Sequence, residues 1–144
     1  MLHVWEKKEI ENYLLNPTIL YQFIPKKLAI EYEDFIKAID VLVEQQRDSV
    51  FDSYSTQYRV DSKLLSNEQW ELKTCNQNAR KFLEAHWTSL DNKLSLVGGK
   101  EFLSCIFAYF KDEYKVSLSK QKLIQAFTPS TIPKEIKDFL AQLN

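Results

Sequence analysis

Glycine is scarce in this sequence, and its scarcity excludes several kinds of phosphate-binding site. The 144 residues include only two glycines, the adjacent Gly98 and Gly99. A Walker A loop or a GxGxxG dinucleotide-binding turn needs spaced glycines, so that backbone N–H groups can approach the phosphates. The GxSxG elbow of serine hydrolases needs spaced glycines as well. We therefore expect no nucleotide-binding loop and no serine-hydrolase elbow in this chain.

Other features that the sequence lacks bear on its class and its compartment. The net charge of −1 shows none of the basic excess typical of nucleic-acid-binding domains, so nucleic acid is expected only as an indirect partner. No run approaches the roughly 18 apolar residues of a membrane span. The first residues also lack the positively charged and apolar regions of a secretory signal. These absences predict a cytoplasmic protein that makes no membrane contact.

The composition predicts a single folded helical domain over residues 1–144. Hydrophobic residues make up 44% and aromatic residues 13% of the chain, which argues against disorder. The length suits one domain that buries about 70% of its unfolded surface. An all-β fold is disfavoured, because its tight turns draw heavily on glycine. We predict an all-α fold of five to seven helices in an irregular bundle, with at most one vestigial strand at residues 2–5.

Apolar residues at helical spacing, together with capping residues, place the predicted elements. Asn16 and Pro17 form an N-cap and first-turn pair, and Ser119 is a second N-cap candidate. Ser66 and Gln69 form a capping-box pattern. The predicted helices cover residues 6–15, 17–23, 32–58 (unbroken or broken near 53–55), 66–90, 100–114 and 119–127, with a last one opened by Pro133. Residues 59–65 are expected to connect two helices, and residues 93–97 to form an extended connector.

Residues with nucleophilic or metal-binding chemistry are few and dispersed. Cys75 and Cys105 fall within apolar helical patterns, which favours two buried free thiols over a disulfide or a metal pair. His3 and His86 form no HxxxH or HExxH arrangement. His86 is therefore interpreted as a residue of the core or its edge rather than a catalytic base. A nucleophilic pair of Cys105 with His86 has no supporting local motif.

Three carboxylates near the start of the chain also permit two interpretations. Glu6, Glu9 and Glu11 fall within two helical turns, where they suit the exposed start of a helix. Carboxylates are also the ligands that Mg²⁺ prefers. However, a two-metal nuclease needs several carboxylates from different elements to hold its ions about 4 Å apart. By composition alone, the helix start is the better interpretation.

A resemblance to a known family adds to these observations. The stretch Glu-Ile-Glu-Asn-Tyr-Leu-Leu at residues 9–15 resembles a motif of OLD-type (overcoming lysogenization defect) proteins, which are ABC-class ATPases with a C-terminal TOPRIM nuclease domain. Residues 97–103, Val-Gly-Gly-Lys-Glu-Phe-Leu, are similar to a helix start in the same region of that family, and residues 132–136 to its final helix. The resemblance implies that residues 1–16 correspond to the end of a TOPRIM domain and residues 17–144 to its helical C-terminal extension.

The departures from the family pattern limit what the resemblance implies. The chain has no Walker A loop, and the eight residues before Glu9 supply neither the separate upstream glutamate strand nor the Asp-x-Asp strand end that the TOPRIM fold needs. The resemblance makes Glu11 the first choice and Glu9 the second for a remnant metal ligand. The chain itself is expected to hold no cofactor, since Mg²⁺ or Mn²⁺ would need the missing TOPRIM part. We expect no enzymatic activity from this chain alone.

Two functional hypotheses follow from the sequence. In the first, the chain is a non-catalytic C-terminal fragment or subunit of an OLD-like ATP-dependent nuclease, in defence against phage or other mobile DNA. In the second, it is a stand-alone cytoplasmic all-α module for protein–protein interaction, either antitoxin-like or phage-encoded. Both predict a protein partner or self-association, and neither involves a small-molecule substrate. Gly98 and Gly99 are expected to form a structural turn, with one of them at positive φ.

Overall fold

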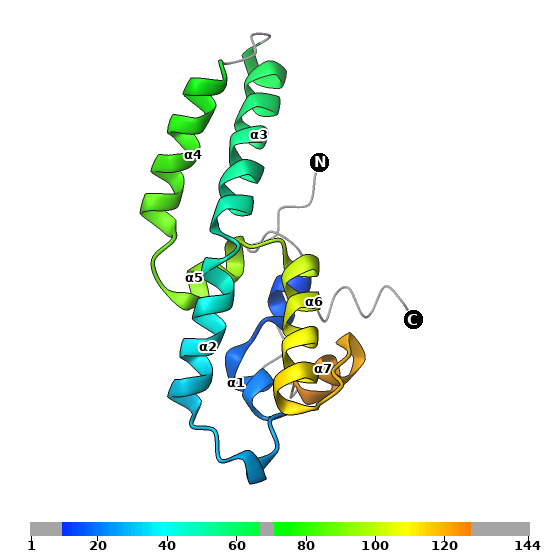
Figure 1. Ribbon diagram of the computed structural model, residues 1–144. Coiled ribbons are helices and arrows are strands. Elements are labelled where there is room, and N and C mark those ends of the chain that lie inside the picture. The colour runs from blue at the N-terminus through cyan, green and yellow to red at the C-terminus, as the bar shows by residue number, and fades with distance from the viewer. Residues whose placement is uncertain (1–9, 67–70, 128–144) are drawn as a thin grey trace.

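A computed structural model describes residues 10–66 and 71–127, and in these residues the protein is all-α (Figure 1). Seven α-helices and three shorter helical segments are present in the described ranges, with no strand. The elements are η1 (Ile10–Leu14), α1 (Pro17–Tyr21), η2 (Lys26–Leu28), α2 (Tyr32–Glu44), α3 (Arg47–Ser66), α4 (Leu72–His86), α5 (Leu90–Leu96), α6 (Gly99–Tyr109), η3 (Phe110–Tyr114) and α7 (Lys120–Ala126). The predicted all-α irregular bundle is confirmed.

Several predicted features lie outside the described residues. They are the strand at residues 2–5, the start of the first helix with Glu9, the second half of the Ser66–Gln69 capping box, and the helix opened by Pro133.

The helices form two parts, a base and an arm (Figure 1). Helices α1, α2, α5, α6 and α7 gather with η1 in the base. Helices α3 and α4 run antiparallel to each other and project away from the base as a two-helix hairpin, which we call the arm. The arm is therefore the part of the described chain that extends furthest from the hydrophobic core.

The core of the base is built from fully buried aliphatic and aromatic side chains. Phe35, Ile39 and Val43 follow one another at intervals of four residues on α2, and all three are completely buried. They pack in one hydrophobic cluster with α6 and η3. The rings of Phe35 and Phe110 meet edge to face with centroids 5.8 Å apart, a geometry that aromatic pairs favour. The periodic stripe seen in the sequence thus faces the core as predicted.

Asn12 is a polar residue inside this core, and its amide joins η1 to the end of α5. Its side chain is completely buried. The Nδ2 atom donates hydrogen bonds to the carbonyl oxygens of Leu94, at 2.7 Å, and of Val97, at 3.0 Å. The last carbonyl oxygens of a helix have no N–H partner within the helix. The Asn12 amide supplies these oxygens of α5 with hydrogen-bond donors.

The glycine pair lies directly against Asn12. Gly98 caps the N-terminus of α6 with φ −62°, and Gly99 is the first residue of that helix. No glycine in the described ranges has a positive φ, so the predicted positive-φ turn at Gly98 or Gly99 is wrong, whereas the helix start at Gly99 is confirmed. A Cβ atom at Gly99 would lie 2.5 Å from Oδ1 and 2.8 Å from the backbone nitrogen of Asn12. Close packing, rather than backbone conformation, therefore requires glycine at position 99.

Two of the predicted capping residues, Asn16 and Ser119, are confirmed, whereas the predicted cap at Ser66 is wrong because Ser66 is the last residue of α3 and Glu71 precedes α4. The Asn16 Oδ1 atom accepts a hydrogen bond from the backbone N–H of Ile19, with Pro17 as the first residue of α1. The Ser119 hydroxyl accepts one from the backbone N–H of Lys122 and begins α7. Both caps act within three residues, which is why a local sequence pattern identifies them.

Several predicted boundaries are wrong. The long helical stretch breaks at residues 45–46 rather than near 53–55, because the backbone N–H of Gln46 turns to the carbonyl of Val43. Residues 59–65, predicted as a connection, continue α3 as the outer part of the arm. Residues 93–97 are not extended, since all but the last belong to α5, which Ser89 caps. Within the described residues, the first helix is a 3₁₀ segment, and η2 is a further short 3₁₀ turn outside the predicted helices.

The Asn12–Gly99 contact predicts the effect of Gly99→Ala. Alanine in a helix gains about 1 kcal/mol of helix propensity over glycine. Overpacking of a tight site costs about 1–3 kcal/mol, and here the clash involves backbone as well as side chain. We expect Gly99→Ala to lower the free energy of unfolding, measured by urea denaturation, despite its better propensity.

Gly98→Ala is the matched control, since Gly98 already has the negative φ that alanine adopts. We expect a smaller loss there. Equal losses in the two variants, or a more stable Gly99→Ala protein, would contradict this account of the contact.

Candidate functional site

The two helices of the arm meet through small side chains. Ser55 and Ser62 of α3 and Cys75 and Ala79 of α4 are buried. The Ser55 hydroxyl donates a 2.5 Å hydrogen bond to Oδ1 of Asn76 across the interface. Since the distance between packed helices depends on the side chains at their contact, this interface allows a close approach. It leaves the larger aromatic residues at the side of the hairpin.

A row of aromatic rings occupies one side of the arm, and we call it the aromatic edge. Its members are Tyr54 and Tyr58 of α3 with Phe82 and His86 of α4. The Phe82 ring lies 4.4 Å from the ring of Tyr54 and 4.4 Å from that of His86, measured between centroids. Tyr58 follows Tyr54 by one helical turn and so shares its side of α3. Tyr54, Tyr58 and Phe82 are half-buried, whereas His86 is exposed.

The aromatic edge lies among exposed apolar and basic residues of the arm. Burial, followed by the neighbouring Tyr58, raises the pKa of the Tyr54 hydroxyl above its usual value of 10.0. The arm also exposes 46% of Val60 and 57% of Leu72. Tyrosine, phenylalanine and arginine are enriched at protein interfaces, and exposed Arg59 and Arg80 lie on the same two helices. The arm therefore presents the residue types that protein partners contact.

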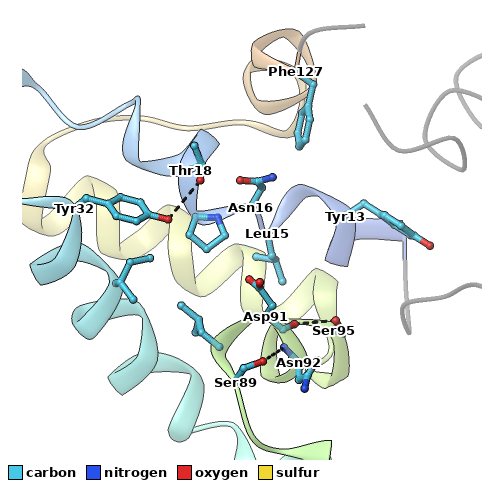
Figure 2. A pocket seen from close by; sticks show the side chains of 13 residues that line it. Tyr13, Leu15, Asn16, Thr18, Tyr32, Ser89, Asp91, Asn92, Ser95 and Phe127 are labelled. Atoms are coloured by element: carbon cyan, nitrogen blue, oxygen red, sulfur yellow. Dashed lines mark hydrogen bonds between the residues drawn. The ribbon is translucent and has the colours of Figure 1, made fainter. Parts of the chain in front are cut away.

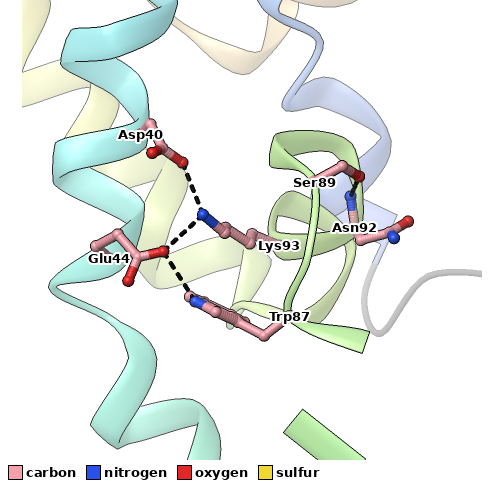
Figure 3. Close-up of polar contacts among 6 residues, drawn as sticks. All are labelled: Asp40, Glu44, Trp87, Ser89, Asn92 and Lys93. Atoms are coloured by element: carbon pink, nitrogen blue, oxygen red, sulfur yellow. Dashed lines mark hydrogen bonds and ion pairs between the residues drawn. The ribbon is translucent and has the colours of Figure 1, made fainter. Parts of the chain in front are cut away.

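An ion-pair network fixes α5 against α2 near the foot of the arm (Figure 3). The Lys93 ammonium lies 3.0 Å from Oδ1 of Asp40 and 2.6 Å from Oε1 of Glu44. The indole Nε1 of Trp87 donates a 2.9 Å hydrogen bond to the same oxygen of Glu44. The network thus connects the end of α2, the residue that follows α4, and α5.

The charges of this network shift the pKa values of its members. The hydrogen bond from Lys93 is the main cause that holds the pKa of Glu44 below its usual value of 4.5. Burial lowers the pKa of Lys93, but the carboxylates of Glu44 and Asp40 outweigh burial, so the net shift is upward. Lys93 therefore stabilises the ionised form of Glu44, and the two carboxylates stabilise the protonated form of Lys93, as expected for a structural ion pair.

A cleft of about 650 Å³ opens between α1, α2 and α5 and is bordered by Phe127 at the end of α7 (Figure 2). Its lining combines hydroxyl and amide side chains with apolar ones, and Asp91 is the one ionisable carboxylate among the described lining residues. The residues that line it are Tyr13, Leu15, Asn16, Pro17, Thr18, Tyr32, Ile36, Ser89, Leu90, Asp91, Asn92, Ser95 and Phe127.

The structure places the residues expected to bind metal as follows. Glu11 lies in η1 and forms an ion pair with Lys120 of α7, with its Oε1 atom 3.1 Å from the lysine Nζ. Glu9 lies outside the described residues. Within the described ranges, no three His, Cys, Asp or Glu side chains come together to hold a metal ion. These residues alone do not fit a metal centre, and the remnant-ligand role of Glu11 and Glu9 stays a prediction.

The thiols and the histidine that the structure describes lie apart from one another in the fold. Cys75 is a buried free thiol in the arm, as expected. Cys105 is free but exposed, so its predicted burial is wrong, because the apolar stripe of α6 turns Phe102 and Ile106 inward instead. His86 lies at the aromatic edge rather than inside the core.

Two residues that organise the molecule were not identified from the sequence. Asn12 belongs to the motif at residues 9–15, but it stands between Glu11 and Tyr13, and nothing in this local sequence marks its amide as buried. Lys93 falls in the predicted extended connector, and its partners Asp40 and Glu44 are some fifty residues away. No local pattern joins these positions.

Comparisons with protein-family models, curated proteins and solved structures found no match to this chain. Among the described helices, none is long and apolar enough to cross a membrane.

The Lys93 network predicts a pH-dependent contribution to stability. Because the pKa of Glu44 is lowered in the folded state, its contribution is present above about pH 4.5 and is lost as the pH falls through the folded value. The raised pKa of Lys93 preserves the pair until the pH rises above 10.5. Both carboxylates are 43% exposed, so we expect Lys93→Met to cost only about 0.5–1 kcal/mol at pH 7.

Urea denaturation of both proteins at pH 7 and pH 3 measures this difference, which should shrink at the lower pH. Lys81→Met, at an exposed lysine on α4, serves as the control for loss of a positive charge. A difference that is unchanged at pH 3 would refute the electrostatic origin of the effect.

Proposed function

We propose that this protein is a helical interaction module that works by binding another protein through its arm. The observation that carries the proposal is the projection of α3 and α4 from the base (Figure 1). The ring contacts of Tyr54, Phe82 and His86 place the aromatic edge along one side of this hairpin. A hairpin packed through small side chains leaves its aromatic residues accessible at the side. Aromatic residues of this kind dominate the binding energy at many interfaces.

The base supports this role by holding the foot of the arm in place. Val50, near the start of α3, is buried in the same hydrophobic cluster as α2 and α6. Trp87, which follows α4, is anchored by its hydrogen bond to Glu44. Both ends of the hairpin are therefore tied to the core, so its direction is fixed before a partner binds. Such preorganisation lowers the entropic cost of association.

Photocrosslinking tests this proposal in the cell in which the protein is naturally made. A photoreactive phenylalanine analogue at Tyr58 samples the aromatic edge, and the same analogue at Lys111 samples the exposed surface of η3 on the base. We expect a discrete adduct with a second protein from position 58 and none from position 111. Mass spectrometry of the adduct distinguishes a different protein from a second copy of this chain.

Two results would count against the arm as the binding surface. One is the absence of any adduct from position 58. The other is the same set of adducts from both positions, which would indicate collisions without specificity.

The resemblance to OLD-type proteins offers a more specific form of this proposal. In that form the chain is a non-catalytic C-terminal fragment or subunit of an ATP-dependent nuclease, in defence against phage or mobile DNA. The alternative is a stand-alone interaction module, antitoxin-like or phage-encoded. The arm supports binding in either form, and only the motif at residues 9–15 favours the first. An upstream reading frame with a P-loop and an Asp-x-Asp motif would distinguish the two.

The nuclease-related form makes a biochemical prediction. The purified chain with Mg²⁺ or Mn²⁺ should leave plasmid DNA intact, as followed by gel electrophoresis. The reason is that Glu11 contributes one carboxylate, already paired with Lys120, whereas a two-metal site needs several. DNA cleavage that is abolished by Glu11→Ala would overturn the non-catalytic assignment. Asp112→Ala, at an exposed carboxylate of η3, is the matched control.

A further inference from the structure

Charged residues on α3 are arranged symmetrically about the middle of the aromatic edge. Arg47, Tyr54 and Asp61 are seven residues apart, so they lie on nearly the same side of the helix. Arg47 begins α3 at the foot of the arm, and Asp61 belongs to its outer part (Figure 1). The basic and the acidic group are therefore equally far from Tyr54, about 10 Å along the helix axis in opposite directions.

The second helix of the arm repeats this arrangement. Glu71 directly precedes α4 at the outer end of the arm, and His86 is the last residue of α4 at the foot. Glu71 lies eleven residues before Phe82, which is close to three full turns, so both are on the side of the aromatic edge. Each helix of the arm thus carries a carboxylate at the outer end of this side and a basic residue at the foot.

These charged groups have bonding capacity left for a partner. Arg47 is exposed and forms no hydrogen bond or ion pair with another described residue. The Oδ1 atom of Asp61 accepts a 2.7 Å hydrogen bond from Nε2 of Gln57, which leaves the Oδ2 atom for a second donor. Glu71 is exposed, and its side chain does not cap α4.

Helix α6 of the base lies on the other side of α3 from the aromatic edge. A hollow of about 430 Å³ between α3 and the start of α6 is lined on α3 by Asp52 and Thr56, among others. Residues two apart lie on nearly opposite sides of a helix, so Tyr54 and Tyr58 face away from this hollow. The middle of the aromatic edge is therefore accessible to a partner that approaches from the side opposite α6.

We propose that a second copy of this chain binds the aromatic edge, with the two arms antiparallel about a two-fold axis at Tyr54. In this dimer each Arg47 lies against Asp61 of the partner subunit, and each His86 lies beside Glu71 of the partner subunit. The aromatic rings pack in the centre, and the two hairpins form a four-helix bundle. A surface with opposite charges at equal distances from its centre is self-complementary, as a two-fold interface requires. This inference rests on the proposed function, because it names the partner of the same surface.

Charge exchange across the interface tests this dimer. The dissociation constant of the 144-residue chain is measured by sedimentation velocity over a range of micromolar concentrations. Arg47→Glu places two carboxylates together at both ends of the interface, and Asp61→Arg places two cations together there. We expect each substitution to weaken dimerisation about tenfold, because two attractive pairs become repulsive. An equimolar mixture of the two variants should dimerise as strongly as the unmodified protein, since each copy then supplies the charge that the other requires.

Arg80→Glu is the matched control for charge reversal on the arm. Arg80 is exposed and follows Asn76 by one helical turn, on the side of the arm where Asn76 binds Ser55. We expect the dissociation constant to stay unchanged in this variant. An equal weakening by Arg80→Glu would overturn the inference, because the effect would then come from net charge rather than from the paired positions.

Other results also decide between this dimer and a different partner. A chain that is monomeric at every concentration would overturn the inference, and so would a mixture of Arg47→Glu and Asp61→Arg that dimerises no better than either variant. If photocrosslinking from position 58 still captures a different protein, the arm remains a binding surface and only the second copy is ruled out as its partner. The absence of any adduct from position 58 would instead contradict the proposed function itself.

Discussion

The buried amide of Asn12 is the contact on which the arrangement of the base depends. A buried polar side chain must find partners, and this one finds them in the carbonyl oxygens of Leu94 and Val97 at the end of α5. The backbone of Gly99 lies against the same side chain. The first residue of α6 therefore packs on the asparagine that binds the carbonyl oxygens at the end of α5. One side chain thereby sets the positions of η1, α5 and α6. The cleft and the Lys93 network, both of which include α5, depend on it in turn.

The base and the arm are held together in different ways. The base buries large side chains such as Phe35, Phe102 and Phe110, which contribute most of the hydrophobic stabilisation. The arm is built on Ser55, Ala79 and other small residues, with α4 as the main packing partner of α3. Regions with few buried apolar contacts open at lower free energy than the core. The outer part of the arm is thus expected to open at a lower free energy than the base, whereas its foot is held by the core.

The ion pairs of the described residues connect separate elements of the fold. Lys93 joins α5 to α2, and Lys120 joins α7 to Glu11 of η1. The perturbed pKa values of Glu44 and Lys93 arise from their mutual contact, with each shift favouring the charged form. Shifts of this sign stabilise the pair, whereas a general acid or base needs a pKa near the working pH.

The sequence predictions succeeded where the contact that sets an element joins residues close together in the chain. The caps at Asn16 and Ser119 involve residues three apart, and both were predicted correctly. The break at residues 45–46 was missed because no proline or glycine marks it. The outer part of α3 was missed because its polar sequence has little periodicity when only α4 covers it. Its helical state follows from the hairpin.

The helical periodicity and the capping residues by themselves predicted the all-α fold of the described residues, and the two adjacent glycines exclude a Walker A or GxGxxG motif from the sequence. The tertiary structure alone decided why Gly99 is a glycine, since its constraint comes from Asn12, far away in the chain. It also decided that Lys93 meets Asp40 across 53 residues and that Lys120 meets Glu11 across 109. Contacts between such distant positions leave no periodic or capping signal, because they arise only when the helices pack.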